Sequence, residues 1–183
     1  MAYSTAEARQ DLLDAVADAI EDLARALAAL GAAYELLDEY KADELEETLF
    51  GPVQLAFGRA RRTHTDFAAR HGLPDRTFAA PQPGAPSTGL KGFIDDAVAA
   101  VTSADATLAT LQDSMMPIEV GDAELRAGLA NVRELVAEVP QRPRAHDRCA
   151  GWGRGGVLEP QAVAAHEREA TELHVHATGH DDV

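Results

Sequence analysis

The N-terminal part of the chain repeats an apolar residue at alternating steps of three and four positions, and this spacing constrains the fold more than any other feature. The repeat consists of Leu13, Val16, Ile20, Leu23, Leu27, Leu30, Tyr34 and Leu37. A strand would alternate every two residues, so the spacing predicts an α-helix with a narrow, coiled-coil-like seam. Ser4 and Glu7 have the spacing of a capping box at its start. We expect one unusually long helix that continues through Gly31 to about Thr48.

Three shorter segments follow the same rule. The sequence "FGPVQ" predicts a turn, after which Pro52 begins a second helix that ends at Gly72. Its inner face is expected to hold Val53, Phe57, Ala60, His64, Phe67 and Ala68. A third stripe consists of Leu90, Ile94, Ala97, Val101, Ala104, Leu108, Leu111 and Met115, and a fourth of Leu125, Leu129, Val132, Val136 and Val139. Pro117 and Pro140 end these two helices, and Asp122 caps the start of the fourth.

These four stripes predict an all-α fold, a four-helix bundle made of two antiparallel helical hairpins over residues 1–139. A chain of 183 residues is long enough for one domain with a sizeable core. Aromatic residues make up only 5% of the chain and alanine is abundant, so we expect a finely grained aliphatic core. The Pro-rich segment 73–89 is longer than most connections in helix bundles, which predicts a crossover or an exposed loop.

The composition changes abruptly after Pro140. Residues 140–183 lose the apolar period and are rich in Arg, Gly and Pro, so we expect a mostly disordered tail. Within it, 161–173 is the stretch that can form a short helix. Two origins of this segment stay open at the level of sequence: a native tail, or a reading frame shifted near the end of the gene.

The predicted helices differ greatly in length. At 1.5 Å per residue the first would extend about 65 Å and the fourth about 25 Å. One chain would then leave part of the first seam uncovered. We therefore predict a homodimer, or a helical protein partner, that docks along the eight seam residues.

The net charge of the chain excludes some classes of binding partner. The formal net charge of −15 argues against general binding to nucleic acid or to an anionic membrane, because both are negatively charged themselves. The longest uncharged apolar run, "ALAALGAAY", is far shorter than the roughly 20 residues of a membrane span. The N-terminus has no signal-peptide pattern and Cys149 is the single cysteine, so we expect a cytoplasmic protein without an internal disulfide.

One basic stretch stands out from this acidic background. Residues 56–72, "AFGRARRTHTDFAARHG", carry Arg59, Arg61, Arg62 and Arg70. In an antiparallel hairpin the nearest acids of the first helix would be Asp38, Glu39, Asp43 and Glu44. Ion pairing between the two helices is the favoured interpretation, with each exposed pair contributing about 0–1 kcal/mol. The alternative is an anion site for a phosphate, an acidic peptide or RNA, because a guanidinium can hold phosphate with two hydrogen bonds.

His64 falls on the inner face of the second helix. A polar residue there can fix the helix register and normally finds a hydrogen-bond partner, which is the structural interpretation. The alternative is a ligand or metal site in which His64 faces the carboxylates of Glu35, Asp38 and Glu39 across the hairpin. The paired Glu-x-x-His motif of di-iron bundles does not occur in the sequence, and we expect no cofactor.

The sequence contains no phosphate-binding loop, no Cys-x-x-Cys and no Gly-x-Gly-x-x-Gly following a predicted strand. We therefore predict a non-enzymatic scaffold or interaction protein that works through coiled-coil-like helix packing. The second hypothesis is a bundle that binds a small ligand or a metal through His64 and the carboxylates of the first helix. The third is contact with an anion or RNA through the stretch from Arg59 to Arg70.

Overall fold

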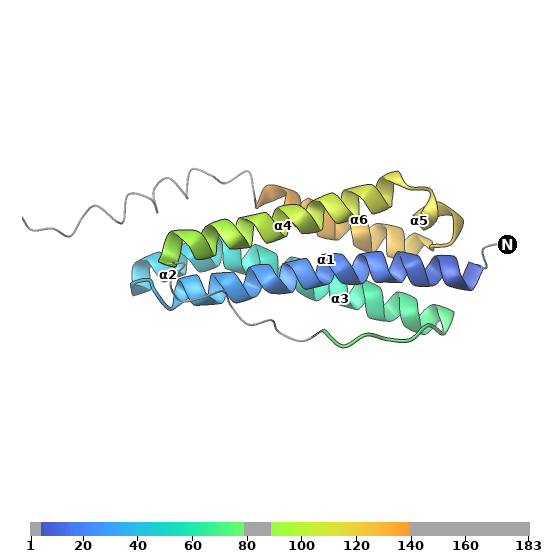
Figure 1. The fold of residues 1–183 in the computed structure, drawn as a ribbon, viewed down its shortest axis with the longest axis horizontal. Helices are drawn as coiled ribbons and strands as arrows, with labels where there is room; N and C mark the ends of the chain where they lie inside the picture. Colours follow the sequence, from blue (N-terminus) through green and yellow to red (C-terminus); the bar gives the residue numbers. More distant parts are fainter. Residues whose placement is uncertain (1–4, 79–88, 140–183) are drawn as a thin grey trace, which may run out of the picture. The chain divides into compact units, whose positions relative to one another are not determined.

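The structure, a computed structural model, describes residues 5–78 and 89–139 (Figure 1). These residues contain helices and no strand, so the all-α fold class is confirmed for them. The elements are α1 (Thr5–Tyr34), α2 (Glu39–Leu45), the π-helix η1 (Glu46–Phe50), α3 (Gly51–His71), α4 (Gly89–Asp113), α5 (Met116–Glu119) and α6 (Ala123–Glu138). The predicted tail over 140–183, with its short helix over 161–173, lies outside the described residues, as does most of the Pro-rich connection.

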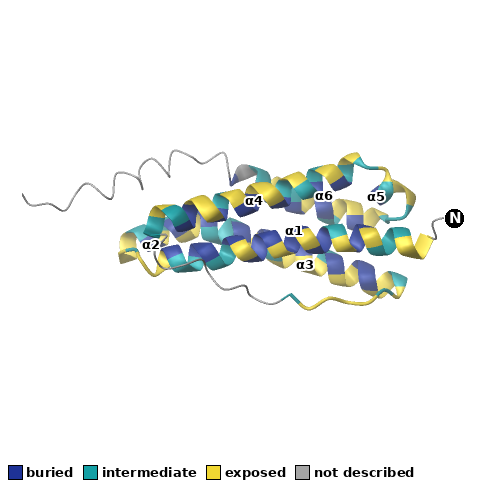
Figure 2. Cartoon of the chain, viewed as in Figure 1, coloured by how far each residue is buried: buried dark blue, intermediate teal, exposed yellow. Residues whose placement is uncertain are grey.

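The four long helices pack through their apolar stripes. α1 packs against α3 and α4, and α6 packs against the same two helices (Figure 1). The buried residues lie on the faces that the helices turn toward one another, and the exposed residues lie on the outer faces (Figure 2). The core is aliphatic and rich in alanine, with Phe67 and Phe93 as its buried aromatic members. This agrees with the finely grained core that the composition predicts.

The seam of α1 is covered by helices of the same chain. Leu13, Val16, Ile20, Leu23 and Leu30 are at most 1% exposed, Leu27 and Leu37 are partly buried against the same core, and Tyr34 is 37% exposed. The inference that an uncovered seam requires a partner is therefore wrong. The reason is length, because α1 has 30 residues and α4 alone has 25, so the two helices nearly match.

The first helix ends earlier than the sequence predicts. α1 stops at Tyr34 instead of Thr48, and the chain turns over residues 35–38. Within this turn the Leu36 N–H donates to the Ala33 carbonyl at 3.1 Å, and Asp38 caps α2 by accepting from the Lys41 N–H at 3.0 Å. The apolar repeat of the first helix fails after Leu37, and the failure marks this turn.

The segment "FGPVQ" is helical, which corrects the predicted turn there, whereas Pro52 does lie in the first turn of α3, as predicted. Phe50 and Gly51 both have right-handed helical dihedrals, so α2, η1 and α3 follow one another from Glu39 to His71. A proline inside a helix removes one N–H and its ring clashes with the preceding turn. The wider π-turn accommodates Pro52: the Gly51 N–H donates to the Glu46 carbonyl, and Thr48 Oγ1 donates to the Glu44 carbonyl at 2.6 Å.

Two predicted helix ends are confirmed. Gly72 adopts the left-handed conformation (φ 64°), and the Leu73 N–H donates to the Ala68 carbonyl at 2.9 Å. Asp122 caps α6 by accepting from the Leu125 N–H at 2.7 Å. These ends fix where α3 stops and α6 starts, which places their charged termini side by side.

Two glycines should respond in opposite ways to alanine. A Cβ on Gly31, inside α1, would meet no described residue within 4 Å, so Gly31→Ala should raise the free energy of unfolding by roughly 0.5–1 kcal/mol. Gly72 has a positive φ, so Gly72→Ala should lower the free energy of unfolding by about 1 kcal/mol. Urea unfolding of both variants measures the two changes. A stabilising Gly72→Ala would contradict the helix end described here.

Candidate functional site

Arg70 belongs to an ion-pair cluster between the end of α3 and the start of α6. Its Nε and Nη2 donate to the two carboxylate oxygens of Asp122 at 2.9 and 3.0 Å, and its Nη1 lies 2.8 Å from Glu124 Oε2. His71 Nε2 lies 3.2 Å from the same Asp122 carboxylate. The predicted pairing of Arg70 with acids of the first helix is therefore wrong. Arg70 pairs with the last helix because the sequence alone does not show which helix lies beside the end of α3.

The Asp122 carboxylate is held ionised by this cluster. Partial burial opposes ionisation and would raise its pKa. The hydrogen bonds from the Arg70 guanidinium, the Leu125 N–H and His71 outweigh burial and lower the pKa from 3.8 to about 2. Asp122 thus caps α6 and binds α3 at the same time, which gives the cluster a structural role.

The other three arginines do not converge with Arg70 on one anion site. Arg61 stacks over the Phe57 ring at 5.5 Å. Arg59 Nη1 donates to Asn131 Oδ1 of α6 at 3.3 Å. Arg59 and Arg62 line an open hollow of about 560 Å³ on the outer face of α3. Within the described part of the chain, Arg62 makes no ion pair.

His64 is buried, as its place on the inner face of the second helix predicts. It is 1% exposed, and the segment after α3 covers it with Phe78, whose ring meets the imidazole edge-on at 5.2 Å. Its Nδ1 has no hydrogen-bond partner among the described residues, since Asp75 Oδ1 lies 3.7 Å away. Burial lowers the pKa of His64, and the attraction of Asp75 for the charged form does not reverse this.

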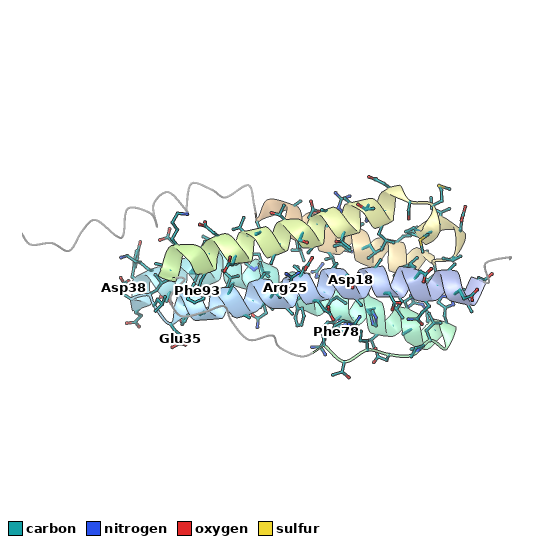
Figure 3. The ribbon with its side chains drawn as sticks, in the orientation of Figure 1. Asp18, Arg25, Glu35, Asp38, Phe78 and Phe93 are labelled. Atoms are coloured by element: carbon teal, nitrogen blue, oxygen red, sulfur yellow. The ribbon has the colours of Figure 1, made fainter. Side chains whose placement is uncertain are left out.

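The carboxylates predicted to face His64 lie elsewhere. Glu35 and Asp38 are at the end of the helices where α1 meets α2, well separated from Phe78, which contacts His64 (Figure 3). Glu39 begins α2 at that same end. Among residues 5–78 and 89–139, no three His, Cys, Asp or Glu side chains are grouped so that they could hold a metal ion. The structure therefore does not bring the four predicted ligand residues together.

Asp38 is already engaged in a local interaction. Its carboxylate caps α2 and lies 3.2 Å from Lys41 Nζ. The hydrogen bond from the Lys41 backbone N–H is the main reason that the pKa of Asp38 is lowered.

The turn between α1 and α2 carries a group of exposed apolar side chains that the sequence analysis missed. Tyr34, Leu36 and Tyr40 are 37%, 55% and 79% exposed, and we call them the end patch. Beside Tyr34 is a pocket of about 250 Å³ lined by Gly31, Tyr34, Glu35, Glu46 and Phe50. The sequence analysis placed Tyr34 on a buried seam because it continued the first helix too far.

Comparisons with protein-family models, with curated proteins and with solved structures found no match for this chain. No helix in the described ranges is both long enough and apolar enough to span a bilayer.

Removing Arg70 should weaken the fold in a pH-dependent way. Arg70→Met should lower the free energy of unfolding at pH 7 by about 1–2 kcal/mol, because two charge-assisted hydrogen bonds to Asp122 are lost. The folded pKa of Asp122, about 2, lies below its ordinary value of 3.8, so this contribution is complete above pH 3.8 and is lost as the pH falls toward 2. In urea unfolding from pH 7 downward, the free energies of unfolding of the wild type and Arg70→Met should become more similar as the pH falls. A difference independent of pH would contradict the assigned role of Asp122.

His64 should make the protein less stable in mild acid. Its folded pKa lies below the ordinary value of 6.5, so its contribution is complete above pH 6.5 and falls as the pH drops below that value. The free energy of unfolding of His64→Leu should depend less on pH between pH 6.5 and pH 5 than that of the wild type. At pH 7 it should be at least as stable as the wild type, because an unpaired buried polar atom costs about 1–3 kcal/mol. If the free energy of unfolding of His64→Leu fell with pH as steeply as that of the wild type, groups other than His64 would cause the fall.

Proposed function

We propose that this chain is a non-enzymatic helical-bundle interaction protein whose partner docks on the end patch. The observation that carries the proposal is the exposure of three apolar side chains, Tyr34, Leu36 and Tyr40, around one turn, with a pocket beside Tyr34. The proposal includes a cytoplasmic location and no cofactor. Binding of a ligand or metal by His64 receives less support, because the carboxylates predicted to join it, Glu35, Asp38 and Glu39, lie around the turn between α1 and α2, away from His64.

We also propose that α1, α3, α4 and α6 form one four-helix bundle of two antiparallel hairpins. In support, the four helices contact one another in a ring: α1 packs against α4, α4 against α6, α6 against α3, and α3 against α1. Arg70, late in α3, binds Asp122 at the start of α6, whereas Arg59, earlier in α3, binds Asn131 further along α6. Opposite directions for α3 and α6 account for both contacts. Such a frame would hold the end patch in one place.

The end patch has the residue types of an interface anchor. Tyrosine is enriched among the residues that dominate binding energy, because its ring buries a large apolar area with few rotatable bonds. Fully burying a side chain such as leucine is worth about 1.5–3 kcal/mol. The residues that line the adjacent pocket include Phe50 and Gly31, which has no side chain. The pocket offers room for one apolar side chain of a partner.

The charges around the patch indicate a basic partner. The acids of this turn and of the helix after it are Glu35, Asp38, Glu39, Asp43, Glu44, Glu46 and Glu47. Lys41 is the only basic residue between positions 35 and 47, and it is paired with Asp38. A concentration of one sign of charge attracts an oppositely charged partner and selects against others. We therefore propose a basic protein segment that inserts one apolar side chain into the pocket.

A peptide selection on the full chain tests this function. We expect displayed peptides enriched on the wild type to carry Lys or Arg on both sides of Leu, Met or Phe. Gly31→Met should fill the pocket and reduce binding of the enriched peptides at least tenfold. It should keep the protein folded, because a Cβ at Gly31 meets no atom within 4 Å in the part of the chain that the structure describes, and the change favours the helix. Isothermal titration measures the affinities.

The matched control is Ile118→Asp, an exposed position in α5, which lies at the opposite end of α1 from α2 (Figure 1) and should leave peptide affinity unchanged. Enrichment of acidic peptides, or equal binding by Gly31→Met, would overturn the proposed docking surface.

A further inference from the structure

The outer face of the α2–η1–α3 segment carries an ordered series of residues that the proposed function does not use. Glu47, Gly51, Leu55, Gly58 and Arg62 follow one another at steps of four, four, three and four, which keeps them on one side of a helix. All but the half-buried Gly51 are exposed. We call this set the outer stripe. It lies away from the inner face, where Val53, Ala60 and Phe67 pack into the core.

The middle of the outer stripe is hollowed. Gly51, Gln54, Leu55, Gly58, Arg59 and Arg62 line the hollow of about 560 Å³. A Cβ built on Gly58 would meet no atom of residues 5–78 or 89–139 within 4 Å, so these residues leave the helix backbone open to close approach there. Leu55 projects beside this opening and is 48% exposed. A cavity next to an exposed leucine can accept a leucine from a facing surface.

The charges of the stripe are segregated along the helix. Glu47 is at one end and Arg62 at the other, with the glycines and Leu55 between them. Neither Glu47 nor Arg62 makes an ion pair within the described part of the chain. In that part of the chain, no ion pair competes with pairing to a second copy.

We propose that the outer stripe pairs with the outer stripe of a second copy of this chain, with the two helices antiparallel. A two-fold axis between Gln54 and Leu55 places Glu47 of each copy opposite Arg62 of the other. The same axis places Gly51 opposite Gly58, so the two backbones approach where neither helix has a side chain. Leu55 of each copy then occupies the hollow of the other. One contact set made twice is the arrangement of an isologous dimer.

The order of charges selects a second copy over other occupants. A purely acidic ligand drawn by Arg59 and Arg62 would lie along a stripe whose other end is Glu47, and a purely basic one would meet the arginines. A partner with both signs in reverse order satisfies both ends, and an antiparallel copy of the stripe has that order. This surface differs from the end patch, so self-pairing and peptide docking can succeed or fail independently.

Charge reversal tests the pairing directly. Sedimentation equilibrium of the full chain should show a reversible dimer. Arg62→Glu should raise the dissociation constant of the dimer at least tenfold, because the introduced carboxylate would then face Glu47 of the other copy. The double variant Glu47→Arg, Arg62→Glu restores opposite charges across the axis and should recover the dimer to within a few-fold of wild type. A wild type that stays monomeric at every concentration, or a double variant no tighter than Arg62→Glu, would overturn the proposal.

A steric variant separates pairing from folding. Gly58→Gln places a long side chain in the hollow, its Cβ meets no atom of the described residues within 4 Å, and glutamine favours a helix over glycine. We expect a monomer whose unfolding temperature is at least that of the wild type. A stable Gly58→Gln dimer would contradict the close approach at this position.

Crosslinking locates the axis. Leu55→Cys in a Cys149→Ser background should form a covalent dimer on mild oxidation, whereas Tyr40→Cys in the same background should not. Efficient crosslinking through Tyr40→Cys with none through Leu55→Cys would place the interface at the end patch and overturn the outer-stripe dimer.

Discussion

The passage of a helix through Pro52 is the constraint on which the other features depend. A proline ring is tolerated inside a helix only where the preceding turn makes room for it. The π-turn η1 provides this room, and the Gly51 N–H, which a regular helix would pair with Glu47, pairs with Glu46 instead. Because the chain stays helical there, it has to reverse direction earlier, over residues 35–38. That earlier turn exposes the end patch and joins Glu47 to the same outer face as Arg62.

Local signals in the sequence predicted the helices that begin and end at strong caps. Gly72 and Asp122 act through their own backbone or side chain within a few residues, so no tertiary information is needed to identify them. The predicted stripe of α4 is confirmed from Ile94 to Leu111, whose members are buried. Its last predicted member, Met115, lies beyond the end of α4 and is 56% exposed, so the stripe was continued too far. The burial of His64 follows from the same periodicity.

The features that the sequence could not predict depend on distant parts of the chain. A proline after a glycine is compatible with the first turn of a new helix and with a helix relieved by a π-turn, and only packing decides between them. The partner of Arg70 depends on which helix lies beside α3. The mistaken grouping of His64 with Glu35 followed from the misplaced turn, since moving the reversal from residue 50 to residue 36 changes which residues face each other.

Two surfaces of opposite character result from this arrangement. The end patch combines exposed aromatic side chains with a local excess of acids, which suits a basic partner. The outer stripe has both signs of charge separated along one helix, which suits a second copy. Beneath both surfaces, the aliphatic residues of the helices form the core. The exposed side chains Leu36, Tyr40 and Leu55 are not part of that core.

Backbone chemical shifts measured by NMR would test the helical passage through Pro52 most directly. The Cα shifts of residues 46–55 should be helical throughout, and those of residues 35–38 should return toward coil values. Amide exchange should be slow at Val53 and Ala56 and faster at Leu36 and Leu37, whose N–H groups make only the hydrogen bonds of the turn. Helical shifts through residues 35–38, with coil shifts at residues 50–52, would contradict the account and would remove the structural basis of both surfaces.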